Sequence, residues 1–339
     1  MKRVGFIGVG KMGISHLAIA NALPGLDVVA ISERSLPLRR ALEKNGSFAC
    51  YTDYARMLAK ERLDGVIIAV PNDRHFSVVK DCLETNVNIF IEKPLTLKFT
   101  ESKQLRDLAD DKEVFGQVGY VNRFNSVFQW LNSVIASGKL GRVLSYECRM
   151  TGSVVVKPNA SGWRNDYASG GGCLFDYGPH CIDLAHYLFG AASKVEYATR
   201  QKIFSSNVDD AVFAALIHEN GTLGRISVNW SDTTVRKATN TVEAHFETGK
   251  LHANKQEARI FLNDNIPEFG LVSGWNVRYS TDFDTQVEYY LRGEDFTRQL
   301  SEFEAKLIDP TAPLRSDLRS ACEVDRVIDE ILNVSEGLV

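Results

Sequence analysis

The first 120 residues alternate short β-rich runs with helix-length segments, and this alternation restricts the fold more than any other feature. The runs with the composition of buried strands are 3–8, 27–32, 64–70, 87–92 and 113–120, with a weaker one at 48–51. The helical segments between them are 11–21, 35–44, 53–60, 75–86 and 100–111. Strands that follow one another through a helix run parallel, so we expect a doubly wound parallel α/β sheet.

The pattern changes after Tyr120. A segment with helical periodicity, 124–137, precedes longer strand-like runs, among them 209–219 and 222–231. Asn220 and Gly221 join these two runs, and that dipeptide is a strong hairpin signal. A second hairpin is predicted around Thr248 and Gly249. We therefore expect an α+β domain with an open-faced, mainly antiparallel sheet, whose uncovered face meets helices or a second subunit.

Length, charge and cysteine usage limit the class of protein. A chain of 339 residues exceeds one ordinary core, so we divide it into domains 1–121 and 122–339. The formal charge of −4, with no block of Lys and Arg, argues against nucleic acid or an anionic membrane as a partner. The six cysteines form no CxxC pair, which indicates no metal site and predicts reduced thiols in a cytoplasmic protein.

The most specific local motif is GxGxxG, which Gly8, Gly10 and Gly13 form between the first predicted strand and helix. Gly8 permits a tight turn, Gly10 lets the backbone approach a pyrophosphate, and Gly13 lets the helix pack close to the strand. Glu33 lies 20 residues beyond Gly13, at the end of the second strand. This combination predicts a dinucleotide site with the pyrophosphate at the helix N-terminus.

Glu33 also bears on the choice of cofactor. A carboxylate at this position accepts hydrogen bonds from the adenosine ribose, which favours NAD, whereas the 2′-phosphate of NADP meets a like charge. Arg34 follows directly and offers a guanidinium to such a phosphate. We expect NAD, with NADP as the alternative if the side chain of Glu33 points away.

Polar residues also mark the ends of two later strands in the predicted parallel sheet. Asn72 and His75 follow the run 64–70, and Glu92 and Lys93 stand at the end of the run 87–92. Ligands of such sheets bind outside the carboxyl ends of the strands. The residues expected to contact the cofactor are therefore Gly8, Gly10, Lys11, Met12, Gly13, Glu33, Arg34, Val70, Asn72, His75, Glu92 and Lys93.

Four motifs in order carry a resemblance to a known family. They are "GVGKMG" at 8–13, "AVPNDRH" at 69–75, "EKPL" at 92–95 and "GGGCLFDYGPHCIDLAHYLFG" at 170–190. Together they resemble the glucose-fructose oxidoreductase, inositol dehydrogenase and MocA (Gfo/Idh/MocA) family over essentially the whole chain. The resemblance implies a Rossmann domain, an open-faced α+β domain that often pairs into dimers or tetramers, and NAD(P)-dependent oxidation of a sugar or polyol hydroxyl, or the reverse reduction.

The same resemblance assigns catalytic roles. Lys93 corresponds to the lysine of the family's EKP motif, and Asp176 and His180 correspond to the carboxylate and histidine of DxGxH. His180 is the natural base and Lys93 stabilises the substrate oxygen, although Lys93 as the base stays open. A helix from about Phe175 would place both groups on one face with Asp183, which orients the histidine or ties down the helix. Proline is tolerated only in the first turn of a helix, so Pro179 predicts a helix start between Phe175 and Gly178.

Substrate recognition and two competing functions remain open. The candidate substrate contacts are Tyr120, Asn122, Trp163 and Arg164, because an aromatic ring beside a guanidinium suits a sugar. One alternative is a nucleotide-sugar dehydrogenase of the same family. The other is a non-catalytic sensor or regulator that binds the dinucleotide without turnover, although such a protein has no need for the three catalytic groups.

Overall fold

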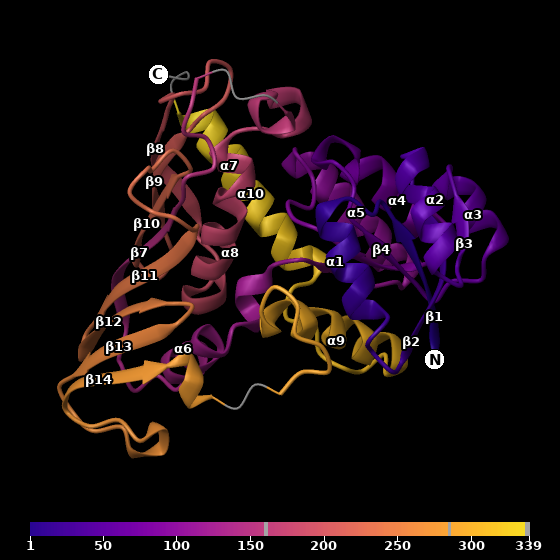
Figure 1. Cartoon of the computed structure of the whole chain (residues 1–339). Helices are drawn as coiled ribbons and strands as arrows, with labels where there is room; N and C mark the ends of the chain where they lie inside the picture. The colour runs from indigo at the N-terminus through magenta and orange to yellow at the C-terminus, as the bar shows by residue number, and fades with distance from the viewer. Residues whose placement is uncertain (159–161, 284–285, 336–339) are drawn as a thin grey trace. The chain divides into compact units, whose positions relative to one another are not determined.

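The computed structural model describes residues 1–158, 162–283 and 286–335, whose elements are labelled in Figure 1. These residues form two units. The first unit contains Met1–Val121 and Gln286–Cys322, and the second contains Asn122–Thr285 and Glu323–Val339. The first boundary falls where the sequence predicted a change of domain, and the chain then crosses between the units twice more.

A six-stranded parallel sheet forms the first unit, with the order β3-β2-β1-β4-β5-β6. Its strands are β1 (Lys2–Ile7), β2 (Leu26–Ser32), β3 (Ala49–Tyr51), β4 (Gly65–Ile68), β5 (Asn88–Ile91) and β6 (Gly116–Val118). Between them lie α1 (Lys11–Ala20), α2 (Leu36–Asn45), α3 (Tyr54–Lys60), α4 (His75–Glu84) and α5 (Phe99–Lys112), with a 3₁₀ turn η1 (Asn72–Arg74) before α4. The predicted doubly wound sheet is confirmed, and its order reverses between β1 and β4, where such sheets bind ligands.

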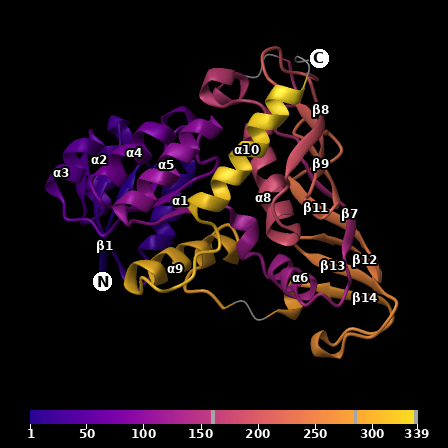
Figure 2. The ribbon, with the colours of Figure 1, turned by 180° about the vertical axis from the view of Figure 1, so that it is seen from behind.

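Helix α9 (Glu294–Ile308) corrects the predicted division of the chain, which placed it in the second domain. Its buried side chains Leu300, Phe303 and Leu307 share one apolar cluster with residues of β1 and α1. A Cβ on Gly65 would lie 2.9 Å from the ring of Phe303, so the helix packs very close to β4. Figure 2 shows α9 beside α1. The apolar face of α9 has its complement about 280 residues earlier in the sequence, which explains why local patterns did not reveal it.

An eight-stranded sheet forms the second unit, with the order β14-β13-β12-β11-β7-β10-β9-β8. The strands are β7 (Val143–Thr151), β8 (Lys194–Gln201), β9 (Ala211–Ile217), β10 (Leu223–Asn229), β11 (Thr239–Phe246), β12 (Gly249–Asn254), β13 (Glu257–Leu262) and β14 (Gly274–Tyr279). Neighbours are antiparallel except β7 and β10. The predicted α+β class is confirmed, and both predicted hairpins, β9 with β10 and β11 with β12, are present.

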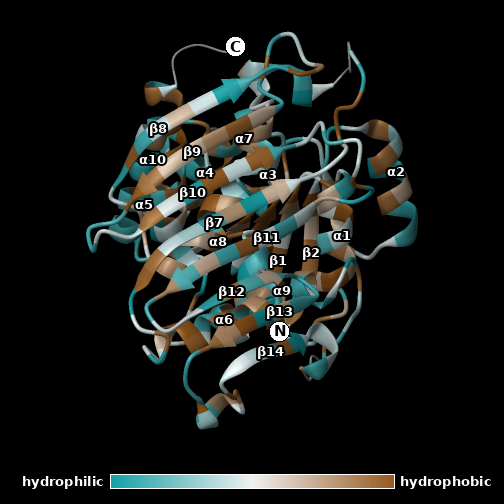
Figure 3. Ribbon diagram, turned by 90° about the vertical axis from the view of Figure 1, so that its left-hand side faces the viewer, coloured by the Kyte–Doolittle hydropathy of each residue, from teal (hydrophilic) through white to brown (hydrophobic). Residues whose placement is uncertain are grey.

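Helices cover one face of this sheet. They are α6 (Ser126–Ala136), α7 (Cys173–Asp176), α8 (Gly178–Phe189) and α10 (Leu318–Val334), the last of which begins in the first unit. Helix α8 lies on β7 and β10, and α6 lies on β12 and β13. None of the described helices of this unit covers the opposite face, which Figure 3 shows from in front. That face carries exposed side chains of Phe213, Leu223 and Trp275.

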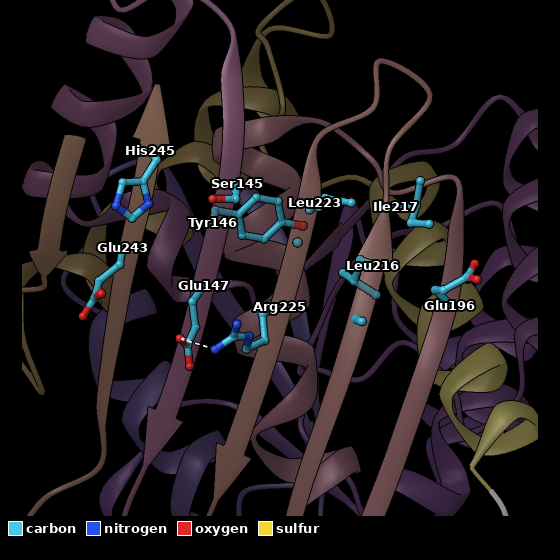
Figure 4. A pocket seen from close by; sticks show the side chains of 12 residues that line it. Ser145, Tyr146, Glu147, Glu196, Leu216, Ile217, Leu223, Arg225, Glu243 and His245 are labelled. Atoms are coloured by element: carbon cyan, nitrogen blue, oxygen red, sulfur yellow. Dashed lines mark hydrogen bonds and ion pairs between the residues drawn. The ribbon is translucent and has the colours of Figure 1, made fainter. Parts of the chain in front are cut away.

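A shallow hollow of about 480 Å³ lies on the open face (Figure 4). Tyr146, Leu223 and His245 help to line it, and Glu147 at its floor is 3.4 Å from a guanidinium nitrogen of Arg225. Glu147 also accepts a hydrogen bond from Arg149. The open face therefore mixes apolar side chains with paired charges. Among the described residues, no helix is both long and apolar enough to cross a membrane.

Candidate active site

The glycine loop joins the end of β1 to the start of α1. Gly8 has φ +84°, and a Cβ there would lie 2.6 Å from the carbonyl oxygen of Ala69. A Cβ on Gly13 would lie 2.3 Å from the carbonyl oxygen of Gly8, which requires glycine for the close packing of helix on strand. A Cβ on Gly10, in contrast, would meet no atom within 4 Å. The space above Gly10, at the N-terminus of a ten-residue helix, fits the pyrophosphate of a dinucleotide.

Glu33 is held against this loop from the end of β2. Its Oε2 accepts a hydrogen bond from the backbone N–H of Val9 at 2.9 Å, and its Oε1 accepts one from Ser35 at 2.7 Å. A carboxylate oxygen has two lone pairs, so both oxygens keep capacity for a ribose hydroxyl. Arg34 is exposed, whereas Glu33 is half-buried. Of the other residues expected at the cofactor, Lys11 is exposed and Met12, Val70 and Asn72 are half-buried.

His75 links the chain segments that follow β4 and β5. The ring is fully buried, with Nδ1 2.6 Å from the carbonyl oxygen of Pro94 and Nε2 3.1 Å from that of Val70. Burial lowers the pKa of His75, and the carbonyl partners oppose this shift only in part. The side chain of His75 has no exposed surface, and its expected contact with the cofactor stays a prediction. His75 fixes the two segments, and the Lys93–Pro94 peptide between them is cis.

Glu92 and Lys93 stand at the end of β5, and both are half-buried. One carboxylate oxygen of Glu92 lies 2.6 Å from Nε2 of His16 on α1. Sequence reasoning did not single out His16. The available signal was its position three residues after Gly13, a histidine among the apolar residues of the dinucleotide helix.

The glycine run 170–172 has a structural explanation in the second unit. The backbone N–H of Gly171 donates to the carbonyl of Asp166 at 2.9 Å, and that of Gly172 donates to the carbonyl of Arg164 at 3.1 Å. A Cβ on Gly171 would lie 2.4 to 2.7 Å from three carbonyl oxygens of residues 163–166. The run therefore lets two short turns, η3 (Trp163–Asn165) and η4 (Tyr167–Ser169), fold back against the start of α7.

Asp176 lies at the end of α7 and His180 lies in the first turn of α8. The helix predicted from Phe175 is interrupted at Tyr177, because Pro179 supplies no N–H and its ring would clash with the carbonyl four residues earlier. Asp176 is buried, and its Oδ2 accepts a hydrogen bond from Nε of Arg164 at 3.0 Å. His180 is half-buried.

Arg164 also lies over the ring of Trp163, with its guanidinium carbon 4.6 Å from the ring centroid. Both side chains keep solvent exposure, and Trp163 is 39% exposed. The ring of Trp163, the guanidinium of Arg164 and the carboxylate of Asp176 thus lie next to one another, with the guanidinium in the middle. Such a set offers an apolar face and polar edges to a ligand.

Asp183 is fully buried on α8, and its Oδ1 accepts from Nε of Arg123 at 2.8 Å. Burial raises the pKa of Asp183, although the guanidinium opposes this shift. The pair ties α8 to the turn η2 (Val121–Phe124), which is the second of the two predicted roles. Asn122 donates to the carbonyl of His180 at 3.4 Å. Tyr120 is fully buried and Asn122 is 2% exposed, and their expected contact with substrate stays a prediction.

Asp209 is a second residue that sequence reasoning did not single out. Its Oδ1 accepts a hydrogen bond from the backbone N–H of Leu174 at 2.8 Å, at the first turn of α7. Its Oδ2 lies 3.7 Å from the guanidinium of Arg200. Asp209 therefore fixes the helix that carries Asp176. The available signal was the pair of aspartates directly before a strongly apolar strand.

The structure groups the predicted site residues by unit. The glycine loop, Glu33 and Lys93 belong to the first unit, and Asp176 and His180 belong to the second. Within the described ranges, no group of three or more His, Cys, Asp or Glu residues is arranged to hold a metal ion.

Two family models match the chain. A model described as an oxidoreductase family with an NAD-binding Rossmann fold matches residues 2–120. A model described as the GFO/IDH/MocA C-terminal domain matches residues 128–252. The two matches follow one another in the chain and fall in the two predicted domains.

Three known proteins show the extent of the likeness. The rhizopine catabolism protein MocA of Rhizobium meliloti is 29% identical over 230 residues, 67% of this chain and 70% of that protein. D-xylose 1-dehydrogenase (NADP(+)) 2 of Haloferax volcanii is 24% identical over 335 residues, 98% of this chain and 97% of that protein. The solved structure of levoglucosan dehydrogenase in complex with NADH has a TM-score of 0.88 at 22% identity, covering 98% of this chain and 96% of that chain. The last likeness establishes a shared fold.

Proposed function

Because this chain belongs to the Gfo/Idh/MocA family of NAD-binding oxidoreductases, we propose that it is a dehydrogenase or reductase of a sugar or polyol. The nicotinamide of the bound cofactor accepts or donates the hydride, and the protein positions the reacting carbon. The observation that carries the proposal is the glycine loop, where open space above Gly10 lies beside the fixed carboxylate of Glu33. Similarity to a D-xylose 1-dehydrogenase over nearly the full length supports a sugar as the substrate class.

We assign the proton chemistry to three side chains. Removing hydride from a carbinol carbon is feasible only as the hydroxyl proton leaves, so a base must lie within hydrogen-bond reach of that oxygen. His180 takes this role, since an imidazole near neutral pH accepts a proton readily. Lys93 stabilises the charge that develops on the oxygen. Asp176, whose partner is Arg164, accepts from a neighbouring hydroxyl and selects the carbon that reacts.

We also propose NAD as the preferred cofactor. Glu33 directs a negative charge toward the position of the adenosine ribose, and this charge disfavours a 2′-phosphate. The exposed Arg34 lacks a comparable anchor among the contacts of the described residues. Glu33→Ala should therefore narrow the preference for NAD over NADP, as measured by the ratio of kcat/KM for the two cofactors. A wild-type enzyme with a clear preference for NADP would overturn this assignment.

Trp163 and Arg164 are the proposed substrate contacts in the second unit. The exposed indole suits the apolar face of a sugar ring, and the guanidinium suits its hydroxyl edge or an acidic substituent. Sugars with and without a negatively charged group should therefore be compared.

A substrate panel tests the proposed activity. Free sugars, inositols and UDP-sugars are each incubated with NAD and with NADP, and the nicotinamide absorbance is followed. We expect turnover with at least one free sugar or polyol. Turnover confined to UDP-sugars would show that the substrates are nucleotide sugars and not free sugars or polyols. Binding of NAD without turnover of any compound would favour a sensor.

The catalytic assignments need their own variants. Lys93→Met and His180→Asn should each lower kcat by roughly 10² to 10⁴-fold, the size typical of lost acid–base or oxyanion stabilisation. The Kd for NAD, measured by fluorescence titration, is the control and should stay within a few fold of wild type. Near-normal turnover in either variant would remove the role assigned to that residue.

We further propose that the chain forms a homodimer or homotetramer through the open face of the eight-stranded sheet. Exposed apolar side chains such as Phe213, Leu223 and Trp275 on that face support this proposal, since single domains rarely expose an uncovered sheet of this size.

A further inference from the structure

A buried histidine on the dinucleotide helix contacts the glutamate that precedes Lys93. Nε2 of His16 lies 2.6 Å from Oε1 of Glu92. The side chain of His16 has no exposed surface, and that of Glu92 is 15% exposed. Because a carboxylate can only accept, the proton of this bond lies on Nε2. The contact joins α1, which begins at the glycine loop, to the end of β5.

Among the described contacts of the His16 ring, the hydrogen bond to Glu92 is the polar one that fixes its orientation. The imidazole packs edge-on against Phe90, with the centroids 5.2 Å apart, and tilted against Phe296 at 6.2 Å. Nδ1 has no hydrogen-bond partner among the residues that the structure describes. Apolar packing alone does not distinguish the two flips of an imidazole, whereas the bond to Glu92 does.

The carboxylate of Glu92 is confined on its other sides. Its backbone N–H donates to the carbonyl of Ile68 at 3.1 Å, which fixes the strand end to β4. A Cβ on Gly119 would lie 3.4 Å from the carboxylate, so the strand end after β6 leaves just enough room for it. The side chain therefore has few alternative positions once His16 holds it.

We propose that His16 is a positioning residue for Lys93. His16 holds the carboxylate of Glu92 as an anion beside that lysine, and it connects the strand end that carries the lysine to the dinucleotide helix. This inference rests on the proposed function, which gives Lys93 its role at the substrate oxygen. It adds a residue that contacts neither substrate nor cofactor.

Electrostatics support the anionic form of Glu92. Burial by itself raises the pKa of Glu92, but the contact with His16, together with the charge of Lys93, outweighs burial and leaves the pKa below its ordinary value. The other charged residues on α1 and within four positions of Phe296 are Lys11, Arg292, Glu294, Asp295 and Arg298. Without His16, burial retains its effect and the largest opposing partner is lost, so Glu92 should gain a proton at a higher pH.

Two substitutions separate the hydrogen bond from the packing. His16→Met keeps an apolar side chain against Phe90 and removes the donor. His16→Gln places an amide N–H near the position of Nε2 and keeps the donor. We expect His16→Met to lower kcat by roughly 10- to 100-fold, the cost usual for losing a group that orients a functional residue. The KM for NAD should change by less than about threefold, and His16→Gln should restore most of the turnover.

The pH profile is the readout that a purely structural role would not move. In His16→Met, the acidic limb of kcat/KM should shift to higher pH, because a protonated Glu92 no longer supports Lys93. In His16→Gln, the limb should stay near its wild-type position. An unchanged limb in His16→Met, or equal defects in both variants, would overturn the proposal.

A stability cycle tests the pair without reference to turnover. Because the pKa of Glu92 is lower in the folded state, its ionised form stabilises the fold above pH about 4.3, and this contribution is lost as the pH falls through the folded value. Glu92→Gln should therefore lower the melting temperature at pH 7 in the wild-type background. In the His16→Met background, Glu92→Gln should leave the melting temperature unchanged. If the two substitutions instead have additive effects on the melting temperature, the proposed interaction between His16 and Glu92 is wrong. If wild type turns over no sugar but the cycle is non-additive, the proposed function fails while the His16–Glu92 interaction stands.

Discussion

Alanine substitutions at two glycines of the same loop should have opposite consequences. At Gly13, a Cβ would lie 2.3 Å from the carbonyl oxygen of Gly8 and 3.0 Å from its carbonyl carbon. Neither backbone atom can rotate away, so α1 has to move off the strand. Overpacking of this kind costs up to about 3 kcal/mol, and the helix propensity of alanine returns about 1 kcal/mol. Gly13→Ala should therefore lower the free energy of unfolding by up to about 2 kcal/mol.

Gly10→Ala is the matched control for folding and the test for binding. The backbone at Gly10, with φ −62° and ψ −163°, is accessible to alanine, and a Cβ there would meet no atom within 4 Å. Stability without cofactor should stay equal or rise by about 0.4 to 1 kcal/mol, because alanine restricts the unfolded chain. The added methyl group would, however, occupy the space proposed for the pyrophosphate. We expect the Kd for NAD to rise at least tenfold, about 1.4 kcal/mol.

Two measurements on each purified variant distinguish these outcomes. Urea unfolding without cofactor reports stability, and fluorescence titration with NAD reports affinity. Wild-type affinity in Gly10→Ala would refute the assignment of this space to the cofactor. Wild-type stability in Gly13→Ala would show that α1 tolerates a small displacement, and that its close packing on β1 contributes little to the free energy of unfolding.

Three further changes test the second unit. Arg123→Met should lower the free energy of unfolding by about 3 to 5 kcal/mol in urea, because Asp183 is left as an unpaired buried charge. The loss should shrink as the pH falls, since protonation of Asp183 removes that charge. Arg164→Met should raise the KM for the sugar roughly tenfold with little change in the Kd for NAD, because Asp176 loses its charged partner. Sedimentation at micromolar concentration should show an oligomer that Phe213→Glu dissociates, and a wild-type monomer would remove the proposed assembly.

Local sequence patterns were sufficient for the strands of the parallel sheet and for two hairpins of the second sheet. The parallel sheet was predictable because each buried run is bounded by glycine or polar residues and followed by helical periodicity. The hairpin at Asn220 and Gly221 was predictable because Gly221, with φ +82°, supplies the backbone conformation that the turn needs. Pro179 likewise limited the predicted helix start to the stretch from Phe175 to Gly178, and α8 begins at Gly178.

Contacts between distant segments could not be read from these patterns. The apolar face of α9 is evident in the sequence, but nothing local states that it packs against β1. His16 belongs to a helix whose other buried residues are mainly apolar, and only its distance to Glu92, 76 positions away, distinguishes it from an inert core residue. Asp209 is similar, because its partner is a backbone N–H that carries no signal in the sequence.

The two glycine clusters illustrate why a motif needs its surroundings before it supports a function. In the first unit, the Cβ position of Gly10 is open, so the chain's own packing gives no reason for a glycine there and the space is available to a ligand. In the second unit, the Cβ position of Gly171 is filled by carbonyl oxygens of residues 163–166, so the absence of a side chain serves the chain itself. Gly171 contributes to a ligand site only indirectly. The turn that it allows contains Trp163 and places Arg164 in contact with Asp176. One cluster therefore argues for a dinucleotide directly, whereas the other argues for a substrate only through the side chains that it positions.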